Sequence, residues 1–169
     1  MLVAGTAELL RIEGAGPAAL GSALGAEVPG DWPPPLYDDG ARRSILRYLE
    51  STPGAGGYGS WYVLLAGDGA GPPVLIGTAG LKGLPGPDGT VEIGYSILER
   101  HQRAGYATEA VAALLAWAFA RPGVRRVVAE TFPELAPSIR VLEKCGFRRA
   151  GPGSEERSIR FERAGPPGS

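Results

Sequence analysis

The sequence predicts a three-layer α/β domain, an α+β arrangement in which helices cover a mixed sheet of about seven strands. One observation is a strand, helix, strand run over residues 90–131, which is typical of a right-handed crossover and predicts two parallel strands at the centre of the sheet. The other is that the remaining strands follow one another through glycine- and proline-containing turns, which favours antiparallel pairing. Residues 1–163 are expected to form one domain, and residues 164–169 a disordered tail.

The first fifty residues are expected to hold one strand and two helices. Residues 6–12 alternate between apolar and polar side chains well enough to predict a first strand. Pro17 favours the first turn of a short helix that runs to about Leu24. Asp38 or Asp39 predicts the N-cap of a helix that continues to about residue 51.

The rest of the chain is expected to alternate strands with two further helices. A long helix is predicted from about Thr108 to residue 121, because Pro122 and Gly123 cannot continue it. A shorter helix is predicted from Pro137 to about Lys144. The predicted strands cover residues 61–66, 73–81, 90–98, 125–131, 147–150 and 157–163.

Composition argues against several classes of function. A formal net charge of −1 without a dense basic block argues against nucleic-acid binding. The single cysteine, Cys145, and the single histidine, His101, argue against disulfides, Ser-His-Asp chemistry and a metal site. The opening residues lack the features of a signal peptide, and no apolar run approaches the length of a membrane span, so a cytoplasmic location without a membrane partner is expected.

The loop over residues 99–107 leads straight into the long predicted helix. Backbone N–H groups at the start of a helix lack internal partners and point toward the positive end of the helix dipole. Gly105 and its small neighbours Ala104 and Ala107 would let a ligand approach these groups closely. The loop therefore predicts a seat for a phosphate or pyrophosphate, although such a glycine turn also occurs for structural reasons alone.

Two motifs in this part of the chain resemble those of a known family. Gln102–Ala107 fits the pattern Gln/Arg-x-x-Gly-x-Gly/Ala and follows the strand Val91–Ile97. Pro137–Phe147 is similar to the segment Asn-x-x-Ser-x-x-x-x-x-Lys-x-Gly-Phe. Together they resemble the GNAT superfamily of N-acetyltransferases, and within it the branch of the ribosomal-protein N-terminal acetyltransferases. The resemblance implies a three-layer fold whose two central parallel strands separate to admit acetyl-CoA.

The resemblance also implies which residues contact acetyl-CoA. Backbone N–H groups of the loop would bind the pyrophosphate, while Arg100 and Arg103 either neutralise its charge or are simply solvated. Backbone groups of Ile97 and Leu98 would pair with the pantetheine amides. Leu135 occupies the position of a family asparagine that contacts the pantetheine. The full expected set is Ile97, Leu98, Arg100, Gln102, Arg103, Ala104, Gly105, Tyr106, Ala107, Thr108, Leu135 and Ser138.

Acyl transfer to an amine needs a base and an oxyanion donor. Glu92, on the central strand, is the candidate base; alternatively it is an exposed glutamate or one paired with a nearby arginine. A strand N–H near residues 95–97 is the expected oxyanion donor. Leu142 stands where the family often has a tyrosine general acid, so that role is vacant or filled from elsewhere. Ser138 either acts near the thioester sulfur or is an ordinary helix residue.

The other reactive side chains favour packing roles. His101 and Tyr95 are expected to pack, and Cys145 is expected to be a small apolar filler rather than a nucleophile. Direct transfer in a ternary complex is therefore favoured over a covalent enzyme intermediate.

Three functions remain in competition. The leading one is acetyl transfer to a primary amine, either of a small molecule or of a protein N-terminus. The second is a non-catalytic acyl-CoA-binding module, and the third, for which the usual glycine motifs are missing, is a nucleotide-phosphate binder. The proline-rich stretch 28–37 carries Trp32, which either packs on the core or forms a wall of the acceptor pocket. A homodimer is a further expectation.

Overall fold

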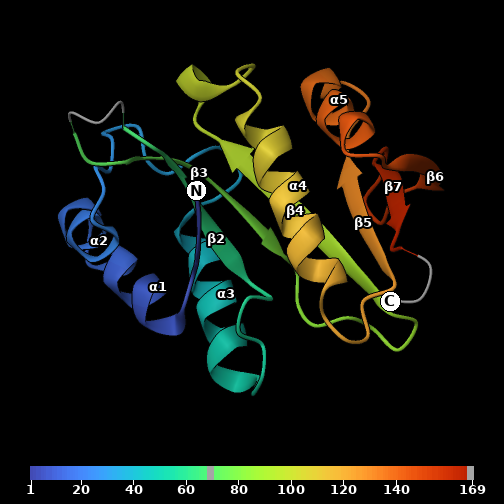
Figure 1. The fold of residues 1–169 in the computed structure, drawn as a ribbon, viewed down its shortest axis with the longest axis horizontal. Helices are drawn as coiled ribbons and strands as arrows, with labels where there is room; N and C mark the ends of the chain where they lie inside the picture. Colours follow the sequence, from blue (N-terminus) through green and yellow to red (C-terminus); the bar gives the residue numbers. More distant parts are fainter. Residues whose placement is uncertain (68–70, 167–169) are drawn as a thin grey trace.

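The computed structural model describes residues 1–67 and 71–166, which form a seven-stranded sheet flanked by five α-helices (Figure 1). The strands lie in the order β1-β2-β3-β4-β5-β7-β6 across the sheet. They are β1 (Leu2–Ala4), β2 (Ser60–Leu65), β3 (Val74–Leu81), β4 (Thr90–Ile97), β5 (Arg126–Thr131), β6 (Arg148–Pro152) and β7 (Ile159–Ala164). The helices are α1 (Ala7–Gly14), α2 (Pro17–Leu24), α3 (Asp39–Ser51), α4 (Tyr106–Phe119) and α5 (Ala136–Lys144), with a 3₁₀ turn, η1 (Glu99–His101), before α4.

The sheet separates two hydrophobic cores, which makes the predicted three layers. On one face α4 and α5 pack with strands β3 to β7 around fully buried residues such as Leu114 and Val127. On the other face α1, α2 and α3 pack on β2 and β3 around Leu10 and Tyr62. Figure 1 shows α4 lying across β4, and α1–α3 grouped at the β1–β3 end. This second core contains no residue of β4 or β5.

The prediction of a strand over residues 6–12 is wrong. Thr6 caps α1 by accepting a hydrogen bond from the Leu9 N–H at 3.1 Å, and Leu10 is fully buried under the sheet. A side-chain cap of this kind satisfies a free helical N–H, which a short alternating pattern does not reveal. The first strand is instead β1, which pairs antiparallel with β2 from Leu2↔Val63 to Ala4↔Trp61.

Most of the other predicted elements are confirmed. The Asp38 carboxylate accepts from the Ala41 N–H at 2.8 Å and so caps α3, as expected. Helix α4 begins at Tyr106, two residues before the predicted Thr108, because Gly105 takes the N-cap position. Within the described residues, no helix has the length and apolar character needed to cross a membrane.

The C-terminal strand enters the sheet between β5 and β6, and pairs antiparallel with both. Ala164 belongs to this strand, and the Gly165 N–H donates to the Arg125 carbonyl at 2.9 Å. The tail predicted over residues 164–169 is therefore wrong for its first two residues. Residues 167–169 lie outside the described residues.

Strands β4 and β5 form the predicted parallel pair, but only at their beginning. The paired residues run from Thr90↔Arg126 to Glu92↔Val128, whereas β4 continues to Ile97 and β5 to Thr131. The Arg126 guanidinium fastens the paired end by donating to the Thr90 hydroxyl at 3.0 and 3.1 Å. Beyond this end the two strands diverge, as Figure 1 shows, and we call the region between their unpaired parts the wedge.

Candidate active site

Unpartnered amides precede α4, as the sequence predicts. The first hydrogen bond of the helix runs from the Glu109 N–H to the Gly105 carbonyl at 3.1 Å, so the N–H groups of Tyr106, Ala107 and Thr108 lie ahead of it. Across the described residues, the N–H groups of Arg103, Ala104 and Gly105 have no backbone partner. Arg103 and Gly105 have φ values of 63° and 91°, and such turns direct successive amides to one side.

The space in front of this loop is open. A Cβ added to Gly105 would meet nothing within 4 Å, so a ligand can reach the backbone at this point. Of the two expected cationic side chains, Arg103 is exposed, whereas Arg100 lies 3.2 Å from Asp31 of the 28–37 stretch. These features fit a diphosphate, whose oxygens would accept from the free N–H groups.

The edge of β4 that borders the wedge exposes the main-chain N–H and C=O groups of every second residue. The Leu98 N–H donates to Ile76 of β3 at 2.9 Å, and the Glu92 carbonyl accepts from the Lys82 N–H at 2.8 Å. The even-numbered residues of β4 are therefore bonded to β3, and the main chains of Tyr95 and Ile97 face the wedge. Gln102 Nε2 donates to the Ile97 carbonyl at 3.0 Å, which ties the loop to this edge.

Tyr95 joins β4 to α5 across the wedge. Its hydroxyl lies 3.0 Å from Ser138 Oγ and 3.1 Å from the Ser138 carbonyl oxygen. Burial raises the pKa of Tyr95 to about 12, so the phenol stays protonated at neutral pH. Sequence reasoning assigned Tyr95 to packing and did not pair it with Ser138; because the partners are 43 residues apart, no local pattern could have done so.

Glu92 faces the side of the sheet away from α4, together with Gly94 and Ser96. Its carboxylate Oε1 accepts from Lys82 Nζ, and its side chain is 29% exposed. Glu92 is therefore ion-paired, as one of the sequence-based alternatives predicted, but its partner is a lysine and not an arginine. Glu130 of β5 lies on the same face, since Val128 is the partner of Glu92 in the parallel register.

Glu130 is a polar residue of this face that sequence reasoning missed. Its Oε2 accepts from the Ser154 N–H at 2.8 Å and from the Ser154 hydroxyl at 2.7 Å. Burial alone would raise the pKa of Glu130, but the hydrogen bonds from Ser154 and the charges of Arg160 and Lys82 lower it below its usual value. The alternation of β5 was the signal that could have placed it on the same face of the sheet as Glu92.

Leu135 is the remaining predicted cofactor-binding residue, whereas Leu142, His101 and Cys145, for which no site role is predicted, are buried or half-buried. Leu135 is the N-cap of α5 and is 40% exposed, whereas Leu142 is buried. The His101 ring contacts Tyr106, with ring centroids 6.4 Å apart, and its Nε2 is buried with no partner among the described residues. Cys145 is buried, and this burial raises the pKa of its thiol, which keeps it unreactive.

The 28–37 stretch is held against α1 by one carboxylate. Glu13 accepts from Trp32 Nε1 at 3.1 Å and from the hydroxyls of Tyr37 and Tyr62, both at 2.8 Å. Trp32 also packs against the second core. Trp32 thus has the packing role, and Asp31 beside it reaches Arg100 in the cofactor loop.

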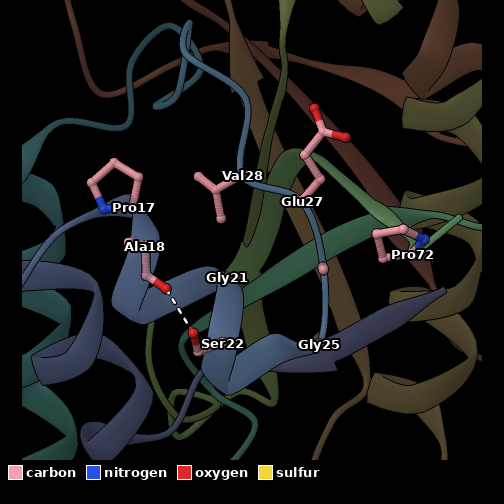
Figure 2. Close-up of a pocket in the computed structure, with 9 residues that line it drawn as sticks. Pro17, Ala18, Gly21, Ser22, Gly25, Glu27, Val28 and Pro72 are labelled. Atoms are coloured by element: carbon pink, nitrogen blue, oxygen red, sulfur yellow. Dashed lines mark hydrogen bonds between the residues drawn. The ribbon is translucent and has the colours of Figure 1, made fainter.

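A surface cavity of about 610 Å³ lies elsewhere on the molecule. Figure 2 shows its walls, which come from α2, the residues that follow it, and Pro72. Apart from Glu27 the lining side chains are small or apolar. The Ser22 hydroxyl donates a hydrogen bond to the Ala18 carbonyl at 3.0 Å. None of the predicted site residues lines it, so the chemistry is not expected there.

A mixed sheet with a wedge beside a row of unpartnered amides is the arrangement expected of a protein that binds a phosphate-bearing ligand at the start of α4. A family model described as an acetyltransferase (GNAT) domain matches residues 19–148, and the chain therefore belongs to the GNAT family of acetyltransferases. The family prediction and the predicted N-acetyltransferase activity class are confirmed. The cosubstrate of this family is acetyl-CoA, in agreement with the sequence-based expectation.

One curated protein and two solved structures illustrate what this chain is similar to. The uncharacterized N-acetyltransferase YjdG of Bacillus subtilis is 32% identical over 124 residues, which cover 73% of this chain and 71% of that protein. The structure of a GNAT-family acetyltransferase from Bordetella pertussis is 28% identical, with a TM-score of 0.59 over 76% of this chain and 79% of that one. The aminoglycoside acetyltransferase AAC(6')-Ib in complex with coenzyme A shares the fold at 20% identity, with a TM-score of 0.61 over 97% and 94%.

Proposed function

We propose that this enzyme transfers the acetyl group of acetyl-CoA to a primary amine by direct attack in a ternary complex. The observation that carries the proposal is the row of free amides at residues 103–108, which lies next to the wedge. These amides would bind the pyrophosphate, with Gln102 holding the loop against Ile97 and Arg103 available to neutralise charge. Acetyl-CoA supplies the acetyl group and a thiolate leaving group.

Glu92 is the proposed general base. A free alkyl amine has a pKa of about 10, so at neutral pH the acceptor arrives as an ammonium that must lose a proton. The carboxylate of Glu92 is partly exposed and already accepts a hydrogen bond from one ammonium, that of Lys82. The acceptor would take the place of Lys82, directly or through a water molecule.

Main-chain N–H groups of Tyr95 and Ile97 are the proposed oxyanion donors, because they face the wedge beyond the last residue paired with β5. The Ser138 hydroxyl, held by Tyr95, is the proposed polar group near the sulfur. Leu142 cannot replace a tyrosine general acid, but a thiol with a pKa of about 8.5 leaves without much acid assistance.

Two acceptor classes are consistent with this site. A small-molecule amine is supported by the likeness to an aminoglycoside acetyltransferase. A protein N-terminus is supported by the motifs that resemble the ribosomal-protein branch. We further propose a cytoplasmic location, and an assembly of two copies.

The second candidate function is an acyl-CoA-binding module without catalysis. It is favoured by the ion pair that occupies Glu92, and by apolar residues at positions 135 and 142. Both candidates require CoA binding, so only turnover distinguishes them.

The deciding experiment measures CoA binding by calorimetry, and acetyl transfer to a panel of amines, for the wild type and Glu92→Gln. We expect unchanged CoA affinity and a fall in kcat of about 10²-fold or more, the usual contribution of a general base. Glu162→Gln, which alters another ion-paired strand glutamate, is the control and should keep its kcat. If CoA binds but no amine of the panel is acetylated, the acyl-CoA-binding module without catalysis is favoured. Thermal stabilisation by ATP or NAD but not by CoA would contradict both candidates.

A further inference from the structure

The Lys82 ammonium lies where the two central strands begin to separate. Its Nζ is bonded to Glu92, the last residue of β4 that pairs with β5. Its Cε lies 3.7 Å from the point where a Cβ on Gly94 would be, so the side chain passes over the next residue of that strand face. Its charge also acts on Glu130 of the neighbouring strand. The ammonium therefore lies at the closed end of the wedge, on the face of the sheet that Glu92 occupies.

A cross-strand ion pair alone would explain this contact. The Lys82 side chain is 64% exposed, and exposed pairs of this kind contribute little to stability. The partner, however, is the carboxylate proposed as the base, and the lysine stem lies over Gly94 at ordinary van der Waals distance from where a Cβ would be. A primary amine is thus held against a base without any diffusional search, which is the main requirement for an efficient intramolecular reaction.

We propose that Lys82 Nζ is an acetyl acceptor of this enzyme, modified within its own chain. The inference rests on the proposed function, since it requires acetyl-CoA in the wedge and Glu92 as base. Glu92 takes one proton from the ammonium, and the freed lone pair of the amine forms a C–N bond to the thioester carbon. The C–S bond breaks, the sulfur leaves with the bonding electron pair, and the second proton of the amine neutralises the thiolate. The products are Nε-acetyl-lysine and CoA, with one proton released from Glu92.

The modification has a consequence for the site itself. Acetylation removes the charge of Lys82 and with it the ion pair to Glu92. An acetylated enzyme would present Glu92 to an external ammonium without competition.

The test incubates the purified full chain with ¹³C-labelled acetyl-CoA and follows intact mass and labelled peptides over time. The chain contains two lysines, so Lys144 on α5 serves as an internal control for non-specific chemistry. We expect a single label on Lys82, at a rate at least about tenfold higher than on Lys144 and independent of protein concentration. Glu92→Gln should abolish the selective labelling, and Lys82→Arg, which keeps the positive charge, should leave the chain unlabelled.

Equal labelling of both lysines would overturn the inference, as would selective labelling that persists in Glu92→Gln. A rate proportional to protein concentration would also overturn it, because it would indicate transfer between copies. The same preparation is assayed with the amine panel and with CoA calorimetry. Turnover of an external amine with Lys82 unmodified would refute this inference and leave the proposed function standing, whereas absence of CoA binding would remove both.

Discussion

At the scale of single residues, two backbone conformations shape the loop before α4. Arg103 has φ of 63° and Gly105 has φ of 91°, values that L-residues with a side chain adopt at a cost of about 1–2 kcal/mol. An arginine held in this conformation indicates that the loop is fixed by its surroundings, among them the Gln102 bond to Ile97. The loop is therefore preorganised for an anion.

Gly105→Ala is predicted to weaken CoA binding. The new side chain meets no atom, so its effect comes through the strained φ, which shifts the loop away from its binding shape. We expect the Kd for CoA, measured by calorimetry, to rise about fivefold to tenfold. Gly123→Ala is the matched control: it has φ of 86° at the opposite end of α4 and should leave the Kd unchanged. An equal loss of affinity in both variants would show that fold destabilisation, not the loop, is responsible.

At the scale of elements, the Glu13 side chain fixes the position of the 28–37 stretch. Glu13 on α1 holds Trp32, Tyr37 and Tyr62 through three hydrogen bonds, and Tyr62 is fully buried. Donors that are buried without an acceptor are costly, so the carboxylate decides how this stretch lies on the second core. Since Asp31 in the same stretch contacts Arg100, its placement also affects the cofactor loop.

Glu13→Ala is predicted to lower the free energy of unfolding by about 3 kcal/mol, because three donors lose their acceptor. Urea denaturation followed by tryptophan fluorescence measures the change. Glu8→Ala, on the exposed side of the same helix, should cost less than about 1 kcal/mol. A loss in Glu13→Ala no larger than that of the control would contradict the role given to this carboxylate.

At the scale of the whole molecule, three buried or half-buried tyrosines link stability to alkaline pH. Burial raises the pKa of Tyr37, Tyr62 and Tyr95 above the ordinary value, in Tyr95 to about 12. In the unfolded chain these groups lose their protons near pH 10, whereas the folded chain retains them. The stabilising contribution is thus complete below pH 10 and is lost as the pH rises through the folded-state pKa.

The free energy of unfolding is accordingly predicted to fall as pH rises from 10 toward 12, by about 1.4 kcal/mol per pH unit for each such tyrosine. In Tyr95→Phe the slope of this fall should be smaller by about 1.4 kcal/mol per pH unit, which is the contribution of one tyrosine. Urea titrations at pH 9, 10 and 11 measure the slope for both proteins. Identical slopes would show that Tyr95 does not titrate differently in the two states.

The sequence by itself determined the features that depend on neighbouring residues. Asp38 or Asp39 predicted the start of α3, Gly105 predicted the free amides before α4, and the crossover over residues 90–131 predicted the parallel pair. Caps, turns and hydrophobic periods act over a few residues, so a linear pattern contains them.

Only the tertiary structure decided the contacts between distant residues. Residues 6–12 alternate like a strand, yet residues 7–12 belong to α1, which the Thr6 cap begins and the burial of Leu10 against β2 and β3 stabilises. The pairs Lys82–Glu92 and Tyr95–Ser138 arise from strand register and from the position of α5, which local propensity does not encode. The physical reason is that burial and hydrogen-bond satisfaction are properties of the packed chain, so the chemistry of the wedge emerges only when β4, β5 and α5 are brought together.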